Sequence, residues 1–321
     1  MKARLRDLIL GMGEGSTPRT LASIATLALL IATTAILIYW RRDDFEHFNW
    51  HLRVEYLVLS AVAFVVALLL VVWLWARLMS ALGQHLPFTT HLRYFGLSNI
   101  AKRLPGTIWY VAGRAYLYKQ KGISPSLIAV ASGVEVITLT LASALVALTF
   151  AGSQLISYIN SDVRTIPFLT ISLIISLISV HPRTIKLIIN ALSGQQPPTF
   201  PTYGFLLTQT LLSAGVWISG GVMFYAFCAS VAQFSWTHLP YIIGVWALSS
   251  LLSSFMFFLP TNFGVKEVSS SLLLSIVMPL PAAVISVIMS RLMVIAYETM
   301  WALASIWSER QLSATTTKEI N

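Results

Sequence analysis

Six long apolar runs constrain this chain more than any other feature of its sequence. A helix needs roughly 20 residues to cross about 30 Å of hydrocarbon. The runs reach that length at residues 20–40, 56–79, 126–151, 203–228, 239–259 and 282–307. Only 10% of the residues are charged, whereas a soluble domain carries about a quarter. The sequence therefore predicts an all-α, polytopic integral membrane bundle.

Two further stretches bring the expected number of membrane helices to seven or eight. Residues 166–180 are short for a span, but a tilted helix or a thinned bilayer accommodates such a length. Residues 263–280 are apolar but interrupted, so they form either an eighth span or a re-entrant segment. We expect a single membrane domain over residues 1–321, weakly divided into halves 1–192 and 203–321 by the proline-rich linker 193–202.

Most of the basic residues lie outside the apolar runs, which indicates a topological use for the net charge of +9. They form no soluble basic face with aromatic stacking platforms, so we expect no nucleic-acid partner. Four lysines and arginines precede the first run, and six lie within residues 84–122, where there is no carboxylate. Because such segments stay cytoplasmic, we expect a cytoplasmic N-terminus and an uncleaved first span.

Two segments of the chain combine apolar bulk with helix-breaking residues and cations. In the first, Pro105 and Gly106 precede Gly113 and Arg114; in the second, Pro260 and Gly264 precede Lys266 and Glu267. Proline removes a backbone donor, so a helix from about residue 88 should stop before Pro105, and a second short helix can begin after Gly106. A helix N-terminus at membrane depth is a potential anion site. The alternative is that both prolines are simple kinks.

Glu135, Arg291 and Glu298 are charged residues that lie well inside the apolar runs. A charge that faces lipid costs a few kcal/mol, so these side chains should face the protein interior. Glu135 could pair with Arg114, with Arg291 or with a substrate cation, and the sequence does not choose among them. A purely structural ion pair that orients helices is a further alternative.

The residues of both broken segments resemble one family. The first segment contains Asn99, the run LPGTIWYVAGRAYLYKQKGIS and, in the following apolar run, Glu135. This order resembles the pattern of the lysylphosphatidylglycerol synthase transmembrane-domain family, a flippase-like family, which has an asparagine, a Pro-Gly, a Gly-Arg and a later glutamate. The run LPTNFGVKE resembles that family's turn ending in Gly-Val-Arg-Glu, with Lys266 in place of the arginine. Lysine keeps the positive charge but lacks the bidentate fork. The resemblance extends over most of the chain.

This resemblance implies about eight membrane helices with two re-entrant elements that meet near the middle. It also implies an integral protein of the bacterial cytoplasmic (inner) membrane that transfers a phospholipid or a lipid-linked (polyprenyl-phosphate) molecule between leaflets. We expect a stand-alone member without the soluble aminoacyltransferase domain, and hence a translocase rather than an enzyme, with no catalytic residue, metal or cofactor. The expected partners are the membrane lipid or lipid-linked substrate, together with a membrane-enzyme partner or further copies of the chain.

The substrate-binding residues expected from these motifs are Asn99, Pro105, Gly106, Gly113, Arg114, Glu135, Gly264, Lys266, Glu267, Arg291 and Glu298. Arg114 and the amides after Gly106 would hold a phosphate, and Lys266 would assist. Glu135 and Glu267 would balance charge or meet a cationic head group. One alternative is an integral membrane glycosyltransferase that uses a polyprenyl-phosphate sugar donor, with Asp43 and Asp44 as its acidic residues. Another is a membrane scaffold that transports nothing.

Overall fold

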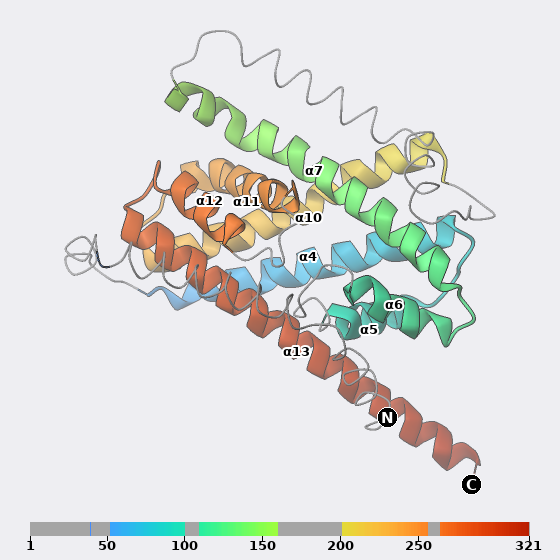
Figure 1. Cartoon of the computed structure of the whole chain (residues 1–321). Coiled ribbons are helices and arrows are strands. Elements are labelled where there is room, and N and C mark those ends of the chain that lie inside the picture. Colours follow the sequence, from blue (N-terminus) through green and yellow to red (C-terminus); the bar gives the residue numbers. More distant parts are fainter. Residues whose placement is uncertain (1–38, 40–51, 100–108, 160–200, 256–263, 321) are drawn as a thin grey trace.

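The computed structural model of the protein describes residues 39, 52–99, 109–159, 201–255 and 264–320. Within these ranges the regular structure is entirely helical (Figure 1). The helices are α4 (Val54–Ala81), α5 (Phe88–Asn99), α6 (Trp109–Lys119), α7 (Pro125–Ile159), α10 (Tyr203–Val231), the 3₁₀ turn η2 (Trp236–His238), α11 (Leu239–Phe255), α12 (Val265–Leu274) and α13 (Leu280–Ile320). The predicted all-α fold is confirmed for the described residues.

Four of the helices are long and apolar enough to cross a membrane: α4, α10, residues 125–152 of α7 and residues 280–308 of α13. They coincide with four of the six predicted runs. Helix α11 has 17 residues, about 26 Å at 1.5 Å per residue, and the end of its predicted run lies outside the described residues. Also outside them lie the run at 20–40, apart from residue 39, the run at 166–180 and most of the linker 193–202. Seven or eight spans therefore remains a prediction.

Residues 263–280 do not form one continuous helix. Helix α12 contains 10 residues, about 15 Å of helix, and a turn over residues 275–278 separates it from α13. Pro279 and Pro281 flank the first residue of α13, where their missing N–H groups cost nothing because the first turn of a helix has no intrahelical acceptors. The described part of this stretch is too short to cross a bilayer alone.

The short helices gather toward opposite ends of the long ones (Figure 1). Helices α5 and α6 pack with α4 and α7, and their apolar core includes Trp75, Tyr94, Tyr118 and Ile128. Helices α11 and α12 pack with α10 and α13 around a second core that includes Phe224, Tyr241 and Leu274. Helix α13 contacts both α5 and α12, so it connects the two regions.

Two glycines lie where helices pack closely against each other. A Cβ atom on Gly221 of α10 would lie 2.6 Å from Ile243 Cα of α11, and one on Gly244 of α11 would lie 2.5 Å from the backbone nitrogen of Ala151 of α7. Small residues permit such close packing in membrane bundles. These two contacts hold α11 against both α7 and α10.

Candidate functional site

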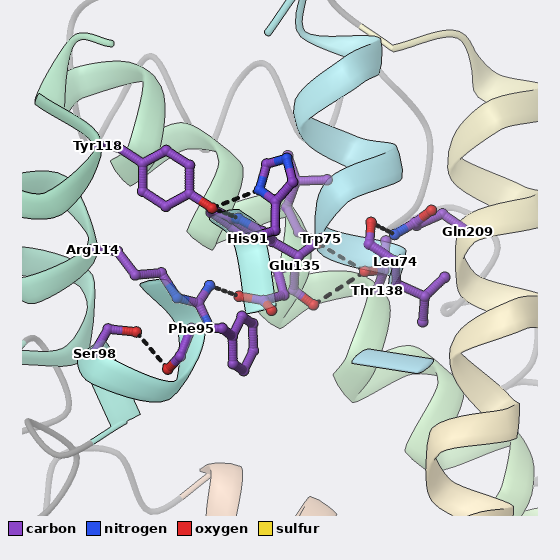
Figure 2. Close-up of polar contacts among 11 residues, drawn as sticks. Leu74, Trp75, His91, Phe95, Ser98, Arg114, Tyr118, Glu135, Thr138 and Gln209 are labelled. Atoms are coloured by element: carbon purple, nitrogen blue, oxygen red, sulfur yellow. Dashed lines mark hydrogen bonds and ion pairs between the residues drawn. The ribbon is translucent and has the colours of Figure 1, made fainter. Parts of the chain in front are cut away.

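A buried ion pair joins α6 to α7. Arg114 Nη1 donates to Glu135 Oε2 at 2.6 Å, and the two side chains are only 1% and 10% exposed (Figure 2). The sequence left several partners open for Glu135, and in the structure its ion-pair partner is Arg114. A pair this deeply buried is much less screened by solvent than a surface pair.

Aromatic rings enclose the guanidinium of Arg114. Its Cζ atom lies 3.9 Å from the ring centroid of Phe95, 4.3 Å from that of Trp75 and 5.3 Å from that of Tyr110. Such cation–π contacts stabilise a desolvated cation by roughly 0.5–2 kcal/mol. Arg114 Nε is buried without a hydrogen-bond partner in the described part of the chain. Glu135 therefore neutralises the charge of Arg114, and the aromatic rings cover the guanidinium. In this arrangement Arg114 is not accessible to a ligand.

A hydrogen-bond chain adjoins the ion pair and was not foreseen from the sequence. The Tyr118 hydroxyl accepts from Trp75 Nε1 at 2.7 Å and lies 2.7 Å from His91 Nδ1 (Figure 2). Burial lowers the pKa of His91 to about 4, so this imidazole is neutral at physiological pH. One signal could have revealed the chain: Tyr118 follows Arg114 by four residues and therefore shares its face of α6.

A pocket lies among α10, α11, α12 and α13. Its cavity volume is about 40 Å³, and its lining residues are Phe224, Trp246, Lys266, Glu267, Ser270, Val287, Ser290, Arg291 and Val294. Its charged groups come from α12 and α13, whereas its other walls are mainly apolar and aromatic. A concave, largely apolar site with a few convergent polar groups is the usual form of a ligand site.

The charged groups of this pocket differ in how they are paired. Arg291 Nη1 lies 3.4 Å from Glu267 Oε1, and Glu267 Oε2 accepts from the backbone N–H of Gly264 at 2.9 Å. Gly264 has a φ of 102°, a conformation that residues with a Cβ rarely adopt. The ammonium of Lys266 lies 3.3 Å from the ring centroid of Trp246. Lys266 makes no hydrogen bond or ion pair with the residues that the structure describes.

The site residues expected from the sequence fall into two groups. Gly113, Arg114, Glu135 and the buried Asn99 belong to α5, α6 and α7, whereas Gly264, Lys266, Glu267, Arg291 and Glu298 belong to the α12 and α13 region. Pro105 and Gly106 lie outside the described residues, as do Asp43 and Asp44.

The two groups lie at different levels along α13. Phe95, beside Arg114, stacks on Trp301 of α13 at 5.7 Å. Trp301 follows Arg291 by ten residues, or about 15 Å of helix. No ion pair or hydrogen bond found among the described residues joins Arg114 or Glu135 to the second group. The described residues therefore form a closed polar cluster and, separately, an open pocket.

The residue types present in the described ranges limit the chemistry further. No three His, Cys, Asp or Glu side chains there are grouped so that they could hold a metal ion, and Cys228 is buried. Compared with known proteins, the chain matches no family model and no curated sequence.

Proposed function

We propose that this protein is a flippase-like translocase that moves a phospholipid or a lipid-linked molecule between membrane leaflets. The observation that supports it best is the pocket among α10, α11, α12 and α13, which places Lys266, Glu267 and Arg291 inside an otherwise apolar helical bundle. Ionisable residues in membrane helices are costly, and they commonly mark substrate paths.

The pocket offers separate surfaces for the two parts of a lipid. Lys266 and Arg291 can attract a phosphate, while Phe224 and Trp246 offer apolar and aromatic contact. Helix α12, which begins at the Gly264 turn, is too short to cross the bilayer alone. Such a short helix suits a re-entrant element beside a headgroup path, and this arrangement is part of the proposal.

The role of Arg114 in the proposal differs from the one expected from the sequence. Its guanidinium is neutralised by Glu135 and enclosed by aromatic rings, so the phosphate is assigned to the Lys266 pocket instead. The Arg114–Glu135 pair then has a positioning role, because it fastens α6 to α7. The family resemblance, the bacterial inner-membrane location and the cytoplasmic N-terminus remain part of the proposal on sequence grounds alone.

The test is reconstitution of the full chain into liposomes that carry fluorescent lipids. A membrane-impermeant quencher measures how much of each lipid reaches the outer leaflet, with protein-free liposomes as the control. Phosphatidylglycerol, phosphatidylethanolamine and a polyprenyl phosphate are assayed separately. Protein-dependent crossing of at least one lipid is expected. If the protein speeds the crossing of none of them, it is not a translocase of these lipid classes.

A further inference from the structure

We propose that Lys266 is a proton-binding site, at which the ammonium gives one proton to water in the pocket and takes one back in each transport cycle. This inference rests on the proposed function and extends it, because it names the ion that moves with the substrate. Three observations support the inference. The ammonium has no direct counter-ion among the described residues, it lies on an aromatic ring, and it borders a cavity that fits water.

The ammonium of Lys266 lies against an aromatic ring instead of a carboxylate. Its Nζ atom is 3.3 Å from the ring centroid of Trp246 on α11. The neighbouring Glu267 does not pair with it, because this carboxylate lies beside Arg291 and accepts from the backbone N–H of Gly264. The ring attracts the ammonium through its charge, so the contact weakens when the lysine becomes a neutral amine. Protonation of Lys266 therefore strengthens the contact between α12 and α11.

The surroundings of Lys266 allow both the charged and the neutral form at neutral pH. Lys266 lies on α12, outside the four helices that are long enough to cross a membrane. Burial lowers the pKa of Lys266 from 10.5 to about 7; Glu267 and Glu298 favour the charged form, and Arg291 opposes it. Helices α10 and α11 line the pocket with aromatic rings alone, which do not titrate. With Lys266 charged, the two cations and the two carboxylates of this cluster balance.

The pocket beside the ammonium has room for water and offers it polar partners. Its cavity volume of about 40 Å³ exceeds the roughly 10–15 Å³ that a cavity needs to hold one water molecule, which also needs two to four polar partners. Lys266, Ser270 and Ser290 line the pocket, and the buried Ser270 makes no hydrogen bond with other described residues. The side chain of Arg291, also in the lining, is 36% exposed, so the pocket reaches the surface.

These groups allow a balanced proton transfer. One N–H bond of the ammonium breaks, and its proton moves to the oxygen of the water, which passes it to water outside the pocket. The electron pair stays on Lys266 Nζ, so the neutral amine can accept a hydrogen bond from Ser270, one helical turn away on the same face. Only the ammonium attracts the phosphate that the proposed function assigns to Lys266. Binding and release of a headgroup therefore accompany uptake and release of a proton.

Nuclear magnetic resonance of the full chain in lipid nanodiscs, with isotope-labelled lysine ε-carbons, tests the proton site independently of transport. The Lys266 signal is identified by its absence from both Lys266→Arg and Lys266→Gln. We expect it to titrate with a midpoint near pH 7, whereas an ordinary lysine titrates near about 10.4. Glu298→Gln removes a charge that favours the ammonium, so the midpoint should fall. Lys119→Gln, at an exposed lysine on α6, should leave the midpoint unchanged.

A pH gradient across liposomes tests the coupling, with fluorescent phosphatidylglycerol as the probe and protein-free liposomes as the control. With one proton per lipid, a gradient of one pH unit can enrich the lipid up to about tenfold in the leaflet that faces the more alkaline solution. We expect the wild-type protein and Lys119→Gln to produce a severalfold enrichment, which a protonophore should abolish. Lys266→Arg stays charged throughout, because arginine does not lose its proton in proteins, so it should give no enrichment. Thermal unfolding shows whether each variant is folded.

Each contrary outcome overturns a stated part of the proposal. If every lysine signal of the wild-type protein titrates above about pH 9, near the ordinary lysine value, the proton site does not exist, and no variant is needed to show it. Lipid crossing that ignores the gradient, or a gradient response that persists in Lys266→Arg, would refute the coupling at Lys266 but not the translocase. If no lipid crosses, the proposed function fails, while the titration still decides whether Lys266 binds a proton near neutral pH.

Discussion

Neutralising Glu135 should strongly destabilise the protein, because it would leave the guanidinium of Arg114 buried without a counter-charge. Glu135→Gln keeps the side-chain size and a hydrogen-bonding group, but it removes the negative charge 2.6 Å from Arg114 Nη1. Arg114 is 1% exposed, so water cannot replace the lost partner unless the helices separate. The perturbation therefore tests whether α6 and α7 depend on this ion pair.

The structure allows the size of the effect to be estimated. Removing one partner of a buried ion pair typically costs about 3–5 kcal/mol. The rings of Trp75, Phe95 and Tyr110 remain around the guanidinium, so we expect a value near the lower end, about 3 kcal/mol. Replacing both partners, in Arg114→Met with Glu135→Gln, removes the buried charge and should cost less than Glu135→Gln alone, because neutral replacements of buried pairs are often tolerated.

A double-mutant cycle measures this coupling. The free energy of unfolding of the wild-type protein, the two single variants and the double variant is followed by tryptophan fluorescence as denaturing detergent is titrated into micelles. We expect a coupling energy of at least about 2 kcal/mol. If each single variant costs less than about 0.5 kcal/mol, or if the two costs simply add, the ion pair does not hold α6 against α7.

Three further outcomes can be measured by the same unfolding experiment. Gly244→Ala should lower the free energy of unfolding by about 1–3 kcal/mol through overpacking, since its Cβ would lie 2.5 Å from the α7 backbone. The control is Gly133→Ala, which should not lower it, because an added Cβ there meets no side chain or neighbouring helix within 4 Å. Tyr118→Phe should cost about 1–3 kcal/mol, because its hydroxyl partners are buried, while Tyr116→Phe, at an exposed position, should have little effect. Burial lowers the pKa of His91 to about 4, below the usual value of about 6.5. The unfolded chain therefore binds the proton first, and stability should fall as the pH falls from about 6.5 towards 4 and stay level above that range. A His91→Gln variant should lose this part of the pH dependence; an unchanged profile would show that His91 is not its source.

Apolar length alone was enough to predict the four helices that are long enough to cross a membrane, because the bilayer thickness sets the length that a crossing helix needs. Helix ends were harder to predict. Helix α4 begins at Val54 and takes Glu55 into its first turn, where a carboxylate interacts favourably with the helix dipole. Helix α10 extends to Val231, three residues beyond its apolar run. Hydropathy reports burial in lipid, whereas a helix ends where its backbone hydrogen bonds and caps end.

The sequence allowed the charged residues of the site to be predicted, but not which of them contact each other. The cations and carboxylates of both groups were recognised because charges within apolar sequence are rare and costly. The partner of Glu135 could not be chosen, since it depends on which helices are neighbours, and the spacing of residues along the chain does not determine that. The pairing of Arg114 with Glu135 and the contact of Lys266 with Trp246 both join different helices. For the same reason His91 and Trp75 could not be distinguished from ordinary core residues.

The most direct test of the proposed function is the initial rate at which phosphatidylglycerol crosses liposome membranes that contain equal amounts of wild-type, Lys266→Gln or Lys119→Gln protein. If headgroups pass through the pocket among α10, α11, α12 and α13, Lys266→Gln should slow protein-dependent crossing about tenfold or more, the effect of about 1.4 kcal/mol at the site. Lys119→Gln should match the wild-type rate. Equal rates for all three proteins would contradict a headgroup path at Lys266.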